Sequence, residues 1–192
     1  SAARANNEPP NYPGSSNYSA AAVPYTNGSI LVCGGKDPAD SKQCWSYYEF
    51  KWSPIKGTSQ SHCTGFTSSL LVAQGWWVTG FTQKKDQQCS TEWTSEIFTG
   101  KTWIPGPGHP KSTKLTFNLP CIANVNATHS LFTGGETINL TNGSRVLSSE
   151  AWLYNWDKAA WSKTGSMITA RFGHGCINLG DQGVLVLGGK IT

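Results

Sequence analysis

The chain has 192 residues, of which 14% are charged and 11% aromatic, and its formal net charge is +4 with the histidines neutral. A chain of this length can bury a sizeable core, and its low charge and frequent aromatic residues argue against intrinsic disorder. The longest basic run is Lys84-Lys85 and no apolar run approaches transmembrane length, so neither nucleic-acid binding nor a membrane span is indicated.

Residues 1–18 are rich in Asn, Pro and Ser, which predicts an extended N-terminal arm. Beyond the arm, one pattern occurs four times: a turn, a short apolar run that predicts a buried strand, and a glycine or glycine pair at its end. The apolar runs end at Gly35, Gly80, Gly135 and Gly189, so the copies are 45, 55 and 54 residues apart. A period near fifty residues predicts a repeat architecture.

Four strand-rich units follow from this spacing, at about 19–57, 62–105, 117–163 and, incomplete, 171–192. In the complete units four antiparallel strands are expected. The strands are predicted near 19–25, 30–35, 44–50 and Trp52; near 67–72, 76–80, 93–98 and Trp103; near 119–125, 129–135, 151–155 and Trp161; and near 171–179 and 184–189. A polar loop is expected at 137–144.

The units resemble the kelch motif. Its features are an apolar strand ending in Gly-Gly, and a Trp six or seven residues after an aromatic or Ile position, as from Ile97 to Trp103 and from Tyr154 to Trp161. The run Arg171-Phe-Gly-His174 resembles the opening of the next repeat, whereas the second unit departs with Thr79-Gly80.

The resemblance implies an all-β fold, a β-propeller of four-stranded antiparallel blades around a central channel, with about three and a half blades in this chain. Three and a half blades do not close a ring. We therefore expect either a chain that continues past Thr192 or assembly with further copies that complete the ring.

Trp52, Trp103 and Trp161 recur at one position of the repeat, which favours packing between blades over a sugar-binding surface. The adjacent pair Trp76-Trp77 must point to opposite faces of its strand, and both faces of a blade are covered, so this pair is also expected to be structural. The four histidines, His62, His109, His129 and His174, match no zinc spacing. We predict no metal, no cofactor and no catalytic residue.

The composition and motifs favour a non-catalytic, protein- or glycan-binding or structural extracellular component. The alternative is part of a secreted enzyme, a kelch-type copper oxidase or a sialidase-like glycosidase, whose catalytic residues lie outside this stretch. Against it, Phe98 stands where an Asp-box would carry its Asp, and Arg4, Arg145 and Arg171 are too few for a sialic-acid site. As a binding or structural component, the chain is expected to have other protein chains or extracellular glycans as partners.

Five N-x-Ser/Thr sequons favour a secreted, extracellular location and N-linked glycans. They lie at Asn17, Asn27, Asn126, Asn139 and Asn142. Consecutive turns of an antiparallel meander lie at opposite ends. Glycans on Asn27 and Asn126 are thus predicted on one face, and a glycan on Asn139 or Asn142 on the other.

An even count of six cysteines in a secreted chain predicts disulfides. Cys33 ends one strand and Cys44 opens its antiparallel neighbour, so these two should pair. Cys63 and Cys89 are predicted to pair within the second unit. Cys121 and Cys176 are predicted to pair across the first strands of consecutive units.

Overall fold

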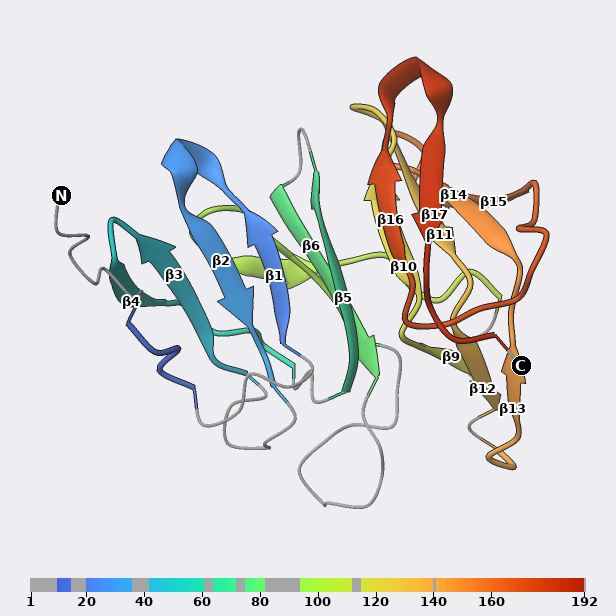
Figure 1. The fold of residues 1–192 in the computed structure, drawn as a ribbon, viewed down its shortest axis with the longest axis horizontal. Coiled ribbons are helices and arrows are strands. Elements are labelled where there is room, and N and C mark those ends of the chain that lie inside the picture. The colour runs from blue at the N-terminus through green and yellow to red at the C-terminus, as the bar shows by residue number, and fades with distance from the viewer. Residues whose placement is uncertain are drawn as a thin grey trace, which may run out of the picture.

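The computed structural model describes residues 10–14, 20–35, 42–60, 64–71, 75–81, 94–111, 115–139 and 141–191. The protein is all-β, and its described strands form five antiparallel sheets (Figure 1). Two short 3-10 helices, η1 (Thr26–Gly28) and η2 (Gly180–Gln182), form turns between strands. Among the described residues, no helix is both long and apolar enough to cross a membrane.

Three sheets have four strands that follow one another in a meander, and a fourth sheet has two strands. The first sheet contains β1 (Ala21–Pro24), β2 (Ile30–Cys33), β3 (Cys44–Tyr48) and β4 (Lys51–Ile55). The second contains β5 (Thr64–Leu71), β6 (Gly75–Phe81), β7 (Thr94–Phe98) and β8 (Trp103–Pro105). The third contains β10 (Cys121–Asn124), β11 (His129–Thr133), β14 (Ala151–Asn155) and β15 (Ala160–Thr164), and the fourth contains β16 (Gly175–Asn178) and β17 (Val184–Leu187).

The expectation of a polar loop at 137–144 was wrong for residues 137–139, which belong to a strand, whereas residues 141–144 do form a turn. This stretch contributes β12 (Glu136–Asn139) to a hairpin with β13 (Arg145–Leu147), and β12 also pairs with β9 (Leu115–Asn118) to give a three-stranded side sheet. The Thr-Ile-Asn alternation of β12 buries Ile138, which is 4% exposed, and this burial favours a strand over a solvated loop.

The sheets are stacked through their first strands. β1 lies against β5, β5 against β10, and β10 against β16, so the sheets follow one another in chain order (Figure 1). Trp76 and Trp77 of β6 are both fully buried. Trp76 belongs to the apolar cluster shared with the first sheet and Trp77 to the cluster shared with the third, so the second sheet is buried on both faces.

Of the tryptophans of the outer strands, Trp103 and Trp161 pack between sheets, as predicted, whereas Trp52 packs against the N-terminal segment. Each donates its indole N–H to a backbone carbonyl of the segment that precedes its sheet. Trp103 Nε1 donates to Lys56 O at 2.7 Å, and Trp161 Nε1 donates to Gly108 O at 2.8 Å. Trp52 Nε1 donates to Pro10 O at 2.9 Å, so the N-terminal segment takes this position at the first sheet.

The glycine pair at the end of β11 is required by close packing against the next sheet. Gly134 and Gly135 have φ of 63° and 87°, in the left-handed region that favours glycine. Gly135 N donates to Arg171 O at 2.8 Å, and a Cβ on Gly134 would collide with His174. Only glycines let the opening segment of the fourth sheet approach β11 this closely.

Two disulfides join the strands that the sequence predicts. Cys33 and Cys44 are opposite residues of β2 and β3, with Cα atoms 4.1 Å apart. Cys121 on β10 and Cys176 on β16 have Cα atoms 6.0 Å apart and connect the third sheet to the fourth. Cys63 and Cys89 lie outside the described residues.

The indole hydrogen bond can be measured with a matched pair of tryptophans. The Trp152 Nε1 atom is buried without a hydrogen-bond partner among the described residues, whereas Trp161 on the adjacent strand donates to Gly108 O. Both substitutions by Phe remove the same atoms, so Trp161→Phe should lower the free energy of unfolding by about 1–2 kcal/mol more than Trp152→Phe. Urea unfolding of both variants measures the difference, and equal losses would contradict it.

The Cys121–Cys176 disulfide should hold the fourth sheet in place. Its partners are 55 residues apart, so in the chain-entropy model replacing both by Ser costs about 4 kcal/mol, against about 3 kcal/mol for Cys33 and Cys44. Amide hydrogen exchange should show lost protection in β16 and β17 for the first double variant, and in β2 and β3 for the second. Protection that persists in β17 after removal of Cys121 and Cys176 would contradict this role.

Candidate functional site

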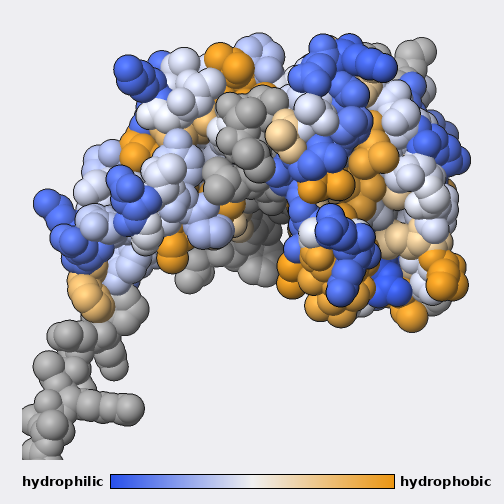
Figure 2. Space-filling view, turned by 90° about the horizontal axis from the view of Figure 1, so that it is seen from above, coloured by the Kyte–Doolittle hydropathy of each residue, from blue (hydrophilic) through white to orange (hydrophobic). Residues whose placement is uncertain are grey.

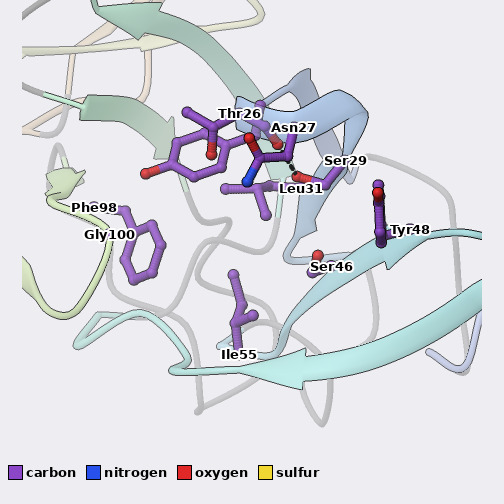
Figure 3. A pocket seen from close by; sticks show the side chains of 10 residues that line it. Thr26, Asn27, Ser29, Leu31, Ser46, Tyr48, Ile55, Phe98 and Gly100 are labelled. Atoms are coloured by element: carbon purple, nitrogen blue, oxygen red, sulfur yellow. Dashed lines mark hydrogen bonds between the residues drawn. The ribbon is translucent and has the colours of Figure 1, made fainter.

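A pocket of about 700 Å³ lies between the first and second sheets (Figure 3). Its wall on one side comes from β2, β3 and β4, and on the other from the end of β7 and the turn that follows it. The turn between β1 and β2 closes one end. Its lining consists of Tyr25, Thr26, Asn27, Ser29, Leu31, Ser46, Tyr48, Ile55, Phe98 and Gly100.

Strand alternation places the first-sheet residues on a common face. Leu31 and Ser46 are opposite each other in the β2–β3 register, and Tyr48 follows Ser46 by two residues. Ile55 is opposite Cys44, two residues before Ser46, and so shares that face. Leu31 is buried, whereas Tyr48 is 46% exposed and stands at the pocket's open side.

Hydrogen bonds fix the turn that closes the pocket. Tyr25 N donates to Ser29 O at 2.7 Å, and Ser29 Oγ donates to Thr26 O at 2.8 Å. Asn27 adopts φ 59° and ψ 25°, a left-handed conformation that Asn tolerates better than most residues. Figure 3 shows the Asn27 amide on the pocket side of the turn, with its nitrogen toward Leu31.

The pocket's chemistry is neutral. Three aromatic and two aliphatic side chains provide apolar surface, and hydroxyls and one amide provide hydrogen-bonding groups. Among the described residues, no carboxylate, imidazole, thiol or basic group lines it. Such a lining suits a neutral ligand that has both apolar faces and hydroxyl groups, and it offers no group suited to proton transfer near neutral pH.

The sequons occupy the two ends of the sheets that the meander predicts. Figure 1 shows the β1–β2 and β16–β17 turns at the upper edge and the β12–β13 turn at the lower edge. Asn27 lies in the first of these turns. Val125, beside Asn126, accepts a hydrogen bond from Asn178 at the end of β16, so Asn126 belongs to the upper edge as well.

Asn139 and Asn142 lie at the β12–β13 turn on the opposite edge. Asn27, Asn126 and Asn142 are exposed and Asn139 is partly exposed, whereas Asn17 lies outside the described residues. N-glycosylation of these positions stays a prediction.

The described histidines have separate surroundings. His174 is buried between the Gly134 and Gly189 backbones, a packing position. His129 accepts or donates within the third sheet through Thr128 and Asn155. His62 lies outside the described residues, and the described part contains no group of three or more His, Cys, Asp or Glu that could hold a metal.

A charged cluster joins the segment after β8 to the third sheet. Glu150 forms ion pairs with Lys111 and with Lys163, the latter at 3.0 Å. Burial alone would raise the pKa of Glu150, but the hydrogen bonds and charges of the two lysines outweigh it and lower the pKa. Burial, assisted by the Lys111 charge and opposed by Glu150, lowers the pKa of His109 to about 4.

The fourth sheet presents an apolar face to solvent. Ile177 and Leu185 are opposite each other in the β16–β17 register, and with Leu187 they are 41–54% exposed. Figure 2 shows apolar atoms gathered over the C-terminal sheets, on the right of the view. The second sheet, by contrast, contributes buried apolar residues to a cluster on each of its faces.

Sequence reasoning did not identify the pocket. Its aromatic residues Tyr25, Tyr48 and Phe98 come from two sheets, and only the stacking of the sheets brings them together. The one available signal was Asn27, which a sequon marks at the tip of a predicted hairpin.

The pKa of His109 predicts acid sensitivity. Because its folded value of about 4 lies below the ordinary value of 6.5, its contribution to stability is complete above pH 6.5 and is lost as the pH falls toward 4. The lowered pKa of His174, caused by burial and the Arg171 charge, acts in the same direction. The melting temperature should fall over this range, and less steeply for His109→Gln; parallel curves for the two proteins would contradict the assignment.

Comparisons with known proteins inform the fold alone. No family model matches the chain, and no curated protein matches its sequence. Solved structures of similar fold exist, with 135 matching chains. One, titled "Structure of YjhT", superimposes with a TM-score of 0.68 at 15% identity and covers 91% of this chain. The chain spans only 62% of that structure's length, and at this identity the likeness is one of fold.

Proposed function

We propose that the chain is part of a secreted, N-glycosylated kelch-type β-propeller that acts as a non-catalytic binding component, and that its inter-sheet pocket binds a neutral glycan. The observation that carries the binding proposal is the pocket's lining, which combines aromatic and aliphatic surface with hydroxyls and one amide and has no charged group. A pyranose ring has apolar C–H faces and a rim of hydroxyls, and it matches such a lining on both counts.

Two features support the propeller. Each of the first three sheets is a four-stranded antiparallel meander, as a blade is, and the first strands of consecutive sheets lie side by side. In a propeller these strands would surround the central channel. The exposed apolar face and unpaired outer edge of β16–β17 are consistent with a further part of the ring, supplied by more chain or by another copy.

Secretion is supported by the two disulfides, since such bonds persist in oxidising compartments. It is supported further by sequons at exposed turns on both edges of the sheets.

The binding proposal predicts micromolar to millimolar affinity for a neutral saccharide, and isothermal titration calorimetry against neutral oligosaccharides of glucose, galactose, mannose and N-acetylglucosamine tests it. The protein for this titration is produced oxidised and without N-glycans. Tyr48→Ala removes an aromatic wall and should weaken binding by about tenfold, the equivalent of about 1.4 kcal/mol.

Tyr47→Phe is the matched control, because Tyr47 lies on the same strand but faces Trp52 on the opposite side of the sheet. It should bind like the unsubstituted protein. Absence of binding across the whole panel, or equal loss in both variants, would reject the pocket as a glycan site.

A further inference from the structure

Two sequons lie in the turns between the first two strands of different sheets. Tyr25 N donates to Ser29 O at 2.7 Å before β2, and Val125 N donates to His129 O at 2.9 Å before β11. The two five-residue turns are thus closed by similar hydrogen bonds but differ in backbone conformation, since Asn27 and Gly28 have φ of 59° and 75° and no residue of 125–129 has a positive φ. Asn27 is the third residue of its turn, whereas Asn126 is the second residue of the other.

The position in the turn and the backbone conformation together direct the two amides differently. Asn126 is exposed, and its Oδ1 accepts hydrogen bonds from Thr128 N at 2.9 Å and Thr128 Oγ1 at 3.1 Å. It is not among the residues that line this pocket. Asn27 has no side-chain hydrogen bond among the described residues, and its amide nitrogen points into the pocket toward Leu31 (Figure 3).

We propose that the first sugar of an N-glycan on Asn27 occupies this pocket, so that the chain's own glycan fills the site in cis and excludes other saccharides. This inference rests on the secretion and the glycan-binding pocket of the proposed function. The attachment joins Asn27 Nδ2 to C1 of N-acetylglucosamine from a lipid-linked diphosphate oligosaccharide. The N–C1 bond forms, the C1–O bond to the diphosphate breaks, and Nδ2 loses one proton.

Attachment to the chain removes most of the cost of binding. A tethered ligand experiences an effective concentration of about millimolar or more, so even a weak contact with Tyr48, Ile55 and the hydroxyls of Ser29 and Ser46 keeps the sugar in place. The pocket volume of about 700 Å³ lies within the range of roughly 300–1,000 Å³ of ligand pockets. A free saccharide at low concentration then meets a site that is already filled.

The test measures how fast a peptide amidase releases each glycan from the native protein. The chain is secreted from cultured eukaryotic cells, treated with the amidase without denaturant, and analysed by glycopeptide mass spectrometry. The amidase must reach the bond between Asn and the first sugar. Release at Asn27 should therefore be at least about tenfold slower than at Asn126, because it requires the sugar to leave the pocket.

Two variants separate occupancy of the pocket from simple crowding. Tyr48→Ala opens the pocket and Ser46→Tyr fills it, and both should raise the rate at Asn27 to that at Asn126 without changing the rate at Asn126. Tyr47→Phe should change neither rate. Circular dichroism melting shows which variants are folded, and one folded variant of the first two is sufficient for the comparison.

Equal release at Asn27 and Asn126 in the unsubstituted protein would overturn the inference, as would a glycan on Asn126 with none on Asn27. Neither result bears on the proposed glycan binding, which the calorimetric titration of the unglycosylated protein tests separately. Conversely, failure of the unglycosylated protein to bind any saccharide, together with protection at Asn27, would reject the external glycan and retain the cis-bound one. Absence of all glycans would overturn the inference together with the argument for secretion from the sequons.

Discussion

The arrangement of the sheets depends on two adjacent tryptophans. Neighbouring residues of a strand point to opposite faces, so complete burial of both Trp76 and Trp77 requires an apolar neighbour on each side of β6. The first sheet supplies one neighbour and the third sheet the other. Two buried indoles represent several kcal/mol of stability each, and a stack of only two sheets would leave one of them in water. Burial of both indoles therefore needs a partner on each face of the second sheet.

Tryptophans of the outer strands also hold neighbouring sheets together. Trp103 and Trp161 each pack against the preceding sheet. Each also donates its indole N–H to a backbone carbonyl in the segment that follows that sheet, which helps to fix the position of one sheet on the next. At the first sheet, Pro10 offers the carbonyl and Tyr12 contacts the Trp52 ring edge-on, so a short N-terminal segment stands in for a preceding sheet. The fourth sheet instead leaves its apolar outer face open to solvent. The outer face of the first sheet is thus partly covered by the N-terminal segment, whereas the outer face of the fourth sheet is exposed.

Local patterns predicted what local forces determine. The strand positions, the Cys33–Cys44 and Cys121–Cys176 pairings and the buried tryptophans follow from alternation, turns and the repeat. The β12–β13 hairpin was missed because its residues are as polar as a loop, and its partner β9 lies about twenty residues upstream, at the predicted start of the third unit, where no strand was expected. The pocket was missed for another reason: it belongs to no single unit, and exists only where the face of the first sheet meets the turn after β7.

The hairpin turns of the sheets share a closing hydrogen bond, but the first of them differs in lining the inter-sheet pocket. The turns before β2, β11 and β17 are closed by equivalent hydrogen bonds, from Tyr25 to Ser29, from Val125 to His129 and from Leu179 to Gly183. Only in the first does an aromatic residue open the turn and an amide occupy its left-handed position. The backbones differ as well, because positive φ falls on Asn27 and Gly28 in the first turn, on Gly180 and Gly183 in the third, and on no residue of the second. Side chains and backbone conformation together account for the difference in lining. The sheets therefore share a turn at this position, and the residues that differ between the turns are those that line the pocket.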